Sequence, residues 1–330
     1  MSSSIHQFQQ QLQQEQQQDI IDTLQAMRRQ EDMYYECSNC YQERSMLIDP
    51  VSCHEPVTIQ TRNVLCDWAN KIIDFCSLDR ETVEIAMNYV DRFVQTEAGL
   101  EILEHSDRFQ LLVVTALYLA IKVHETVAIS SCQFEKISRN TFTADDVEQM
   151  EVTLLEGLEW HLHPPTSLCF VRLYLDLMPT TRMAGKEMKE TAFILAKIQT
   201  ELAVRDAALV SAKASTIAFA SLMNAFEALA FADSLTGSFV VNAFVAKVAT
   251  LSLVSKAVFY DGDHVMRPIQ MRLYQAIAKQ TDIELFSTGP EGTHAPNSPT
   301  TPIPSTPPRR GVARTKSFEE TPRSIISRTA

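Results

Sequence analysis

The segment from Phe109 to Val123 carries apolar side chains on every side of a helix. Such a helix has no face left for solvent, so the pattern predicts that it lies at the centre of a helical bundle. It is interrupted by Gln110 and Lys122 and is too short to span a bilayer. Lys122 must bring its ammonium group to water or to a partner, because burying an unpaired charge is costly.

Apolar residues three or four positions apart predict four further helices around this one. They begin at Ile59, at about Arg80, near Cys132 and at Thr143. Thr58 or Thr61 is placed to cap the first, and Thr143 with Asp146 has the spacing of a capping box. Residues 20–163 are therefore expected to form one five-helix bundle, preceded by an amphipathic helix from Ile20 that docks on the body.

The same order of helices recurs in the second half of the chain. Pro164 and Pro165 mark the boundary, since neither can continue a helix interior. An apolar, alanine-rich helix at Leu209–Leu229 then occupies the ordinal place of the central helix. We therefore predict an all-α fold of two tandem five-helix bundles, the second at residues 164–286.

The two ends of the chain have a different composition. Residues 1–19 form a Gln-rich, low-complexity segment, which is expected to be disordered or a loosely formed helix. Residues 287–330 are rich in Pro, Ser and Thr and cannot bury enough apolar surface to fold, so a disordered tail is predicted. The tail is basic, whereas the body is acidic.

Composition narrows the class of protein further. Eight glycines are too few for Gly-rich phosphate loops or for a many-turned β fold. The net charge of −12 makes a poor nucleic-acid surface, because neutralising phosphates requires clustered cations. The seven cysteines form no regular framework, and neither a signal peptide nor a membrane span is evident. We therefore expect a protein of the nucleus and cytoplasm, without membrane or direct nucleic-acid partners.

Two groups of residues superficially suggest metal sites. Cys37 and Cys40, followed by Cys53 and His54, suggest zinc, but a second pair of well-spaced ligands is missing, so ordinary thiols are the favoured interpretation.

Asp145, Asp146 and Glu148 resemble the carboxylates that bind Mg²⁺ in some all-α prenyl-transfer enzymes. Helix capping explains them more simply, because carboxylates at a helix start accept from free N–H groups. No nucleophile or phosphate-loop motif is found, so neither catalysis, a cofactor nor a metal is expected.

Several strings resemble the cyclin box in order and spacing. They are Thr61–Trp68 (TRNVLCDW), Met87–Phe93 (MNYVDRF), Ala120–Lys122, Met150–Glu151 and Leu158–Trp160. The string AMNYVDRF and the Lys-x-x-Glu-Thr that ends at Thr126 are similar to D-type cyclins, although a Leu-x-Cys-x-Glu motif near the N-terminus is missing. The resemblance is strong over residues 20–178, weak over 179–280 and absent from the tail.

The resemblance implies roles for five residues. Arg62 and Asp91 would form a buried ion pair between the first two helices, and Leu111 would lie in the core. On pattern alone, Lys122 and Glu151 would be solvated helix residues. The resemblance instead implies that these two bind the backbone around the kinase helix that carries a catalytic glutamate.

The resemblance also implies a groove on the first helix that docks substrate peptides. Its matching residues here are Val64, Leu65, Trp68 and Gln110. Thr61, Ser106 and Lys71 replace a methionine, an arginine and a glutamate of the family pattern. With Lys71 in place of the glutamate, the groove lacks the acidic residue that would pair with a basic peptide.

The leading hypothesis is a regulatory subunit, without catalysis of its own, that binds and activates a cyclin-dependent kinase and controls cell-cycle progression. Docking peptides and kinase inhibitors are further possible partners. One alternative is a general-transcription adaptor, which uses the same tandem fold on DNA and carries a zinc ribbon. Another is an α-helical Mg²⁺ enzyme, which would need a carboxylate-lined cavity where the central helix lies.

Proline follows four hydroxyl residues of the tail, the pattern of proline-directed phosphorylation sites. These candidate sites are Ser298, Thr301, Thr306 and Thr321. The simpler interpretation is a linker in which a Pro- and Thr-rich composition produces the matches by chance.

We predict that Thr306 is phosphorylated by the kinase that the chain activates, because Pro307 follows it and Arg309 lies three positions on. Mass spectrometry of a reconstituted complex with ATP should show this phosphate, and Pro307→Ala should abolish it. If every Ser-Pro and Thr-Pro site of the tail remains unmodified, the prediction is wrong and the tail is interpreted as a linker.

Overall fold

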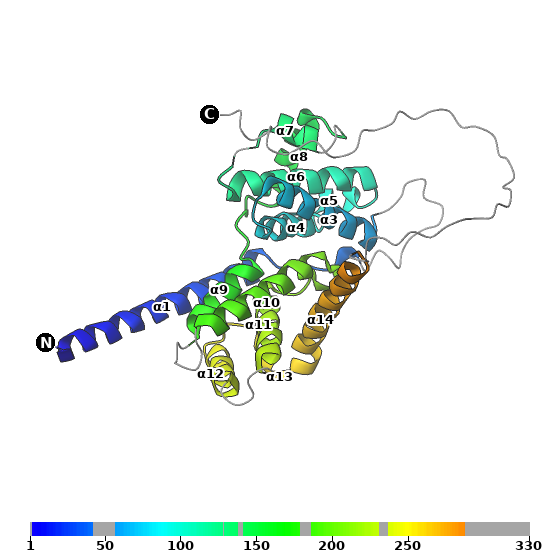
Figure 1. The fold of residues 1–330 in the computed structure, drawn as a ribbon. Coiled ribbons are helices and arrows are strands. Elements are labelled where there is room, and N and C mark those ends of the chain that lie inside the picture. The colour runs from blue at the N-terminus through cyan, green and yellow to red at the C-terminus, as the bar shows by residue number, and fades with distance from the viewer. Residues whose placement is uncertain are drawn as a thin grey trace, which may run out of the picture. The chain divides into compact units, whose positions relative to one another are not determined.

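The computed structural model describes residues 2–41, 57–127, 129–137, 141–178, 186–230 and 237–287. Within these ranges the regular structure is helical and no strand occurs, as the sequence predicts (Figure 1). The chain divides into a compact unit of residues 1–279 and a second unit of residues 280–330. Both helical bundles lie in the first unit, and none of the described helices is long and apolar enough to cross a membrane.

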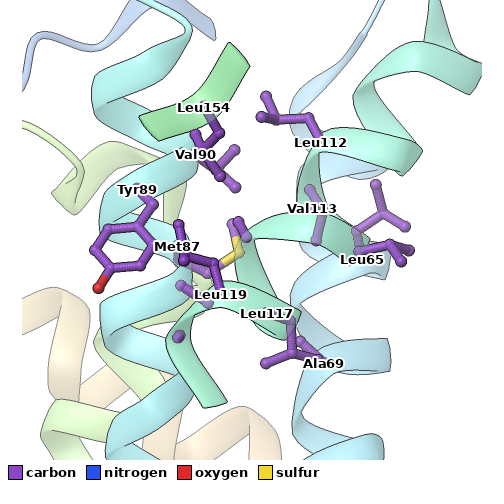
Figure 2. Close-up of a cluster of buried hydrophobic side chains, with 14 of the residues drawn as sticks. Leu65, Ala69, Met87, Tyr89, Val90, Leu112, Val113, Leu117, Leu119 and Leu154 are labelled. Atoms are coloured by element: carbon purple, nitrogen blue, oxygen red, sulfur yellow. The ribbon is translucent and has the colours of Figure 1, made fainter. Parts of the chain in front are cut away.

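The first bundle is organised around the apolar helix that the sequence singles out. Its elements are α3 (Ile59–Cys76), α4 (Glu81–Phe93), α5 (Glu97–Ile102), α6 (Ser106–His124), α7 (Ser131–Ile137) and α8 (Ala144–Gly157). Every residue of α6 from Leu112 to Ile121 is buried. Figure 2 shows side chains of α3, α4 and α8 gathered around it, such as Leu65, Val90 and Leu154. The predicted central position of this helix is confirmed.

Side-chain caps fix where α3 and α8 begin. The Thr58 hydroxyl accepts from the backbone N–H of Thr61, and the Thr61 side chain accepts from that of Thr58. Thr143 and Asp146 form the same reciprocal pair at α8, with N···O distances of 3.2 and 2.9 Å. Hydrogen bonds from Thr143 hold the pKa of Asp146 below its usual value. Asp146 is therefore a helix cap, as the simpler interpretation predicted.

The short helix α5 has no counterpart in the sequence prediction. The Thr96 side chain caps it, and Gly99 lies where an added Cβ would come within 1.9 Å of the Phe93 carbonyl oxygen. Only glycine permits this close approach of α5 to the end of α4. A six-residue helix that depends on one close contact leaves too little periodicity to be recognised.

The second bundle repeats the arrangement with its own core. Its elements are α9 (Ser167–Leu177), α10 (Lys186–Arg205), the 3-10 turn η1 (Ala207–Leu209), α11 (Ala214–Ala230), α12 (Gly237–Thr250), α13 (Ala257–Tyr260) and α14 (Gly262–Ser287). Tyr174, Phe219 and Phe244 pack edge-on or tilted at centroid distances of 6.1–6.3 Å. The alanine-rich helix begins at Ala214 rather than at the expected Leu209, because residues 207–209 form the separate turn.

The first helix, α1 (Ser2–Tyr34), runs through the Gln-rich segment without a break. The predicted amphipathic stretch docks through Leu24, which is fully buried, in the core of the second bundle beside α9. The buried Glu31 carboxylate accepts from the backbone N–H of Ser215 at 2.8 Å and so caps α11. Although α1 precedes the first bundle in sequence, it therefore packs on the second.

Arg62 of α3 and Asp91 of α4 form a bidentate, buried ion pair. The Nε–Oδ1 and Nη2–Oδ2 distances are 3.0 and 2.6 Å, and the two residues are 2% and 5% exposed. The Tyr41 hydroxyl donates to Asp91 at 2.9 Å, and the third nitrogen of Arg62 donates to the Val204 carbonyl at 3.0 Å. Because Val204 lies on α10, this pair joins the two bundles as well as two helices of the first.

We predict that Arg62→Ala lowers the free energy of unfolding by about 3–5 kcal/mol, because it leaves the Asp91 carboxylate buried without its partner. Denaturant unfolding followed by circular dichroism measures the loss. Arg108→Ala, which removes an exposed arginine of α6, should change it by no more than about 0.5 kcal/mol. Equal effects of the two substitutions would contradict this role.

Candidate functional site

The C-terminal end of α6 and the middle of α8 bring Lys122 and Glu151 together. The Lys122 Nζ atom lies 2.8 Å from Glu151 Oε1, and the side chains are 52% and 11% exposed. Glu151 lies in the middle of α8. The most apolar helix of the first bundle thus ends in an ion pair that solvent or a partner can reach.

The local electrostatics keep Lys122 charged. Its hydrogen bond to Glu151 raises the pKa of the Lys122 ammonium above the ordinary value. The ammonium also lies 5.6 Å from the centre of the Tyr118 ring, a distance suited to a cation–π contact. A lysine has three donors and a carboxylate has several acceptor sites, so the pair retains hydrogen-bonding capacity beyond its mutual contact. Together they can bind both N–H and carbonyl groups of another backbone.

Exposed apolar residues lie on the same helix or just beyond it. Val152 is 56% exposed next to Glu151 in α8, and Trp160 is 68% exposed shortly after the helix ends. Glu159 and Trp160 both adopt left-handed backbone conformations, with φ of 51° and 61°. This conformation is unfavourable for residues with a Cβ, so the turn holds Trp160 out at a cost. Trp160 belongs to one of the strings that resemble the cyclin box, but the sequence does not indicate that its side chain is exposed.

The residues proposed for a peptide groove do not share one environment. Val64 of α3 is 65% exposed, Trp68 and Gln110 are half-buried, and Leu65 belongs to the core of the first bundle. Leu65 therefore supports the helix from within and offers little surface to a ligand.

Leu111 lies at the edge of the first core. It is only half-buried and packs against the buried cluster, whereas the sequence placed it inside. It lies beside Gln110 on the part of α6 that is less completely covered than Leu112–Ile121.

The suspected metal ligands do not assemble in the part of the chain that the structure describes. No group of three or more His, Cys, Asp or Glu side chains suited to a metal ion is found there. Burial raises the pKa of the Cys37 thiol to about 12. Cys53 and His54 lie outside the described residues, as do Ser298, Thr301, Thr306 and Thr321 of the tail.

The carboxylates of the suspected Mg²⁺ site have other partners or are exposed to solvent. Glu148 accepts from the Ser131 hydroxyl at 2.8 Å, which ties α8 to α7, and Asp146 caps α8. Asp145 is exposed in the first turn of α8. The cluster is thus accounted for by the start of α8 and its contact with α7.

Tyr41 and Val204 complete the Arg62 network but could not be found from the sequence. Tyr41 lies outside every predicted helix, and Val204 contributes only its backbone carbonyl. Every residue type has a backbone carbonyl, so the amino-acid sequence does not indicate which carbonyl accepts this hydrogen bond.

Comparisons with known proteins show what the chain is similar to. The sequence model of the family "Cyclin, N-terminal domain" matches residues 22–163. The chain is 32% identical to the G1/S-specific cyclin-E of Caenorhabditis elegans over 136 residues, which are 41% of this chain and 25% of that protein. It is 27% identical to the G1/S-specific cyclin-D1 of Mus musculus over 202 residues, 61% of this chain and 63% of that protein.

The chain therefore spans about a quarter of the cyclin-E relative and less than two thirds of cyclin-D1. The structure of a viral cyclin from herpesvirus saimiri matches with a TM-score of 0.51 at 13% identity, over 72% of this chain and 96% of the viral one. At that identity the match shows the fold alone. Because the chain is similar to both E-type and D-type cyclins, these comparisons do not assign it to the D type.

Proposed function

The chain belongs to the cyclin family through its N-terminal domain, and on that premise we propose that it is a regulatory subunit that binds and activates a cyclin-dependent protein kinase in the nucleus and cytoplasm. The observation that carries the proposal is the Lys122–Glu151 pair, which lies 2.8 Å apart at the accessible end of the buried helix α6. The contact between Lys122 and Glu151 uses only part of the hydrogen-bonding capacity of each side chain.

The proposed mechanism is positional. An active kinase requires an ion pair between the lysine that positions ATP and a glutamate on a mobile helix. The first bundle would press against that helix, with Lys122 donating to its backbone carbonyls and Glu151 accepting from its N–H groups. Charge-assisted hydrogen bonds of this kind are short and directional, so they fix the helix in one position.

Apolar contact would supply the remaining affinity. Val152 and Trp160 are the exposed apolar residues on α8 and directly after it. A tryptophan held out on the surface is typical of the residues that dominate protein interfaces. The kinase chemistry itself would remain with the partner.

We predict that Lys122→Ala/Glu151→Ala folds normally but loses the kinase. An ion pair with one half-exposed member contributes no more than about 1 kcal/mol to stability, so melting should change little. At a desolvated interface each truncation should cost roughly 2–5 kcal/mol of affinity, because polar groups of the kinase lose their partners. Capture of a cyclin-dependent kinase and phosphorylation of a substrate protein measure the loss.

The matched control is Lys186→Ala/Glu190→Ala, which removes an ion pair of the same chemistry from the surface of α10 at 3.6 Å. It should bind and activate as the unmodified chain does. Normal kinase activation by the Lys122→Ala/Glu151→Ala protein would remove the residue-level support for the proposed function.

The face of α3 that carries Val64 and Trp68 is proposed as a docking surface with altered specificity. Lys71 follows these residues at helical spacing, is exposed, and makes no ion pair with any residue that the structure describes. An ammonium group there repels the arginine of a basic docking peptide.

We predict that a peptide containing Arg-x-Leu binds weakly and that Lys71→Glu tightens binding by about two- to fivefold, the size of an exposed charge contact. Fluorescence polarisation with a labelled peptide measures the dissociation constant. Lys136→Glu, the same charge change at an exposed site on α7, is the control. Tight binding by the unmodified chain would refute the role given to Lys71.

A further inference from the structure

A hollow of about 220 Å³ lies where the end of α1 meets the end of α8. Its walls include Met33 and Tyr34 from the last turn of α1, Glu36 just after that helix, and Glu159 and His161 after α8. None of its lining residues belongs to α3 or α6. Sites for small molecules typically measure roughly 300–1,000 Å³, so a hollow of this size suits one inserted side chain.

Tyr34 forms an aromatic wall of this hollow. Its ring stacks on His161, with the ring centroids 4.4 Å apart and an angle of 17° between the planes. Tyr34 is nevertheless 45% exposed, so the part of its ring that faces away from His161 is open to solvent. Met33 beside it is exposed as well. An open aromatic face attracts cations, and methionine adapts its shape to apolar groups.

Two carboxylates at the hollow have no close counter-ion. Glu159 is exposed and makes no ion pair with any residue that the structure describes. Glu36 lies 4.0 Å from the Lys213 Nζ atom, whereas Asp32 lies 2.5 Å from the same atom and is its closer partner. Both glutamates can therefore accept hydrogen bonds from a donor that enters from outside.

The arginine that lines the hollow supports the backbone instead of pairing with these carboxylates. Arg92 of α4 donates to the Leu158 and His161 carbonyls at 3.3 and 2.9 Å, and its guanidinium lies 4.8 Å from the centre of the Tyr35 ring. Burial lowers the pKa of Arg92, and the charge of Glu159 is among those that oppose the change. Two carboxylates and one guanidinium leave the lining with an excess of negative charge.

The turn that carries Glu159 is held in one conformation. Glu159 has a left-handed backbone, and the two carbonyls that Arg92 binds belong to Leu158 before it and to His161 after it. A strained backbone of this kind persists only where its surroundings fix it, and such positions are common at ligand sites. The Glu159 carboxylate is therefore presented from a fixed backbone.

We propose that this hollow binds an arginine side chain presented by a peptide segment of a partner protein. The guanidinium would lie on the open side of the Tyr34 ring and donate to Glu159 and Glu36, and the neighbouring apolar atoms of the peptide would contact Met33. Arginine suits the site better than lysine, because its planar group stacks on aromatic rings and binds carboxylates through two donors. The net charge of −12 attracts a basic segment.

The test uses Trp160, which lies in sequence between two residues of the lining and is one of two tryptophans in the chain. In Trp68→Phe it is the only tryptophan, so its fluorescence reports on the hollow. The probe is the acetylated and amidated peptide Ala-Leu-Arg-Leu-Ala, and the control peptide carries citrulline, which has the shape of arginine without its charge. The arginine peptide should change the emission saturably and bind about fivefold more tightly than the citrulline peptide. Equal binding of the two peptides, or no saturable change, would overturn the proposal.

Variants at the hollow test the carboxylates directly. Glu159→Gln and Glu36→Gln keep the size of the side chain and remove its charge, so each should weaken the arginine peptide about two- to fivefold. The matched control is Glu187→Gln, the same change at an exposed position of α10, which should bind as the unmodified chain does. Unchanged binding by a chain that carries both substitutions at the hollow would contradict the assigned site.

Fluorescence polarisation of the labelled peptide with the unmodified chain gives the dissociation constant even when Trp68→Phe fails to fold. Lys122→Ala/Glu151→Ala should bind the peptide normally, since neither residue lines the hollow, so this result is separate from the kinase assay. Binding that Lys71→Glu tightens and the variants at the hollow leave unchanged would place the peptide on α3 and refute the proposal. Equally tight binding of spermidine would show a site for small cations instead of a peptide.

Discussion

The fold depends on one buried ion pair. Arg62 and Asp91 have given up water, and the loss is offset only because each atom of the pair finds a partner: the two side chains bind each other, Tyr41 donates to Asp91, and Val204 accepts from Arg62. Buried pairs of this kind add little net stability over well-packed apolar residues, but they are strongly destabilising when one member is lost. The pair therefore fixes α3, α4 and the end of α10 in one arrangement rather than simply adding to the strength of the core.

The ion pair between Lys122 and Glu151 has the opposite consequence, because its exposure differs. Arg62 is 2% exposed, whereas the Lys122 side chain is 52% exposed. Burial closes the first pair to a ligand, whereas the second has donors and acceptors that solvent or a partner can reach. With α3 and α4 fixed around it, α6 presents Lys122 at a defined place beside Glu151 of α8. Burial thus separates the pair that builds the domain from the pair that we propose binds a kinase.

The all-α fold, the central helix and the capped starts of α3 and α8 could be predicted from sequence, because apolar periodicity and capping residues are local signals. Contacts between distant segments could not. The docking of α1 on the second bundle, the Val204 carbonyl beside Arg62 and the Ser167 N–H beside Glu84 all depend on the tertiary arrangement. Leu111 shows the same limit within one helix, since the sequence gives its apolar character but not that the bundle leaves its side half covered.

Hydrogen exchange of the chain, with and without a purified cyclin-dependent kinase, tests the proposed binding surface most directly. Amides at the end of α6 and in α8, over residues 120–126 and 148–156, should exchange more slowly in the complex, because a partner that binds Lys122 and Glu151 covers them. Exchange in α11 and α12 of the second bundle should be unchanged. Complex formation with no added protection at α6 and α8, or with protection confined to the second bundle, would contradict the account.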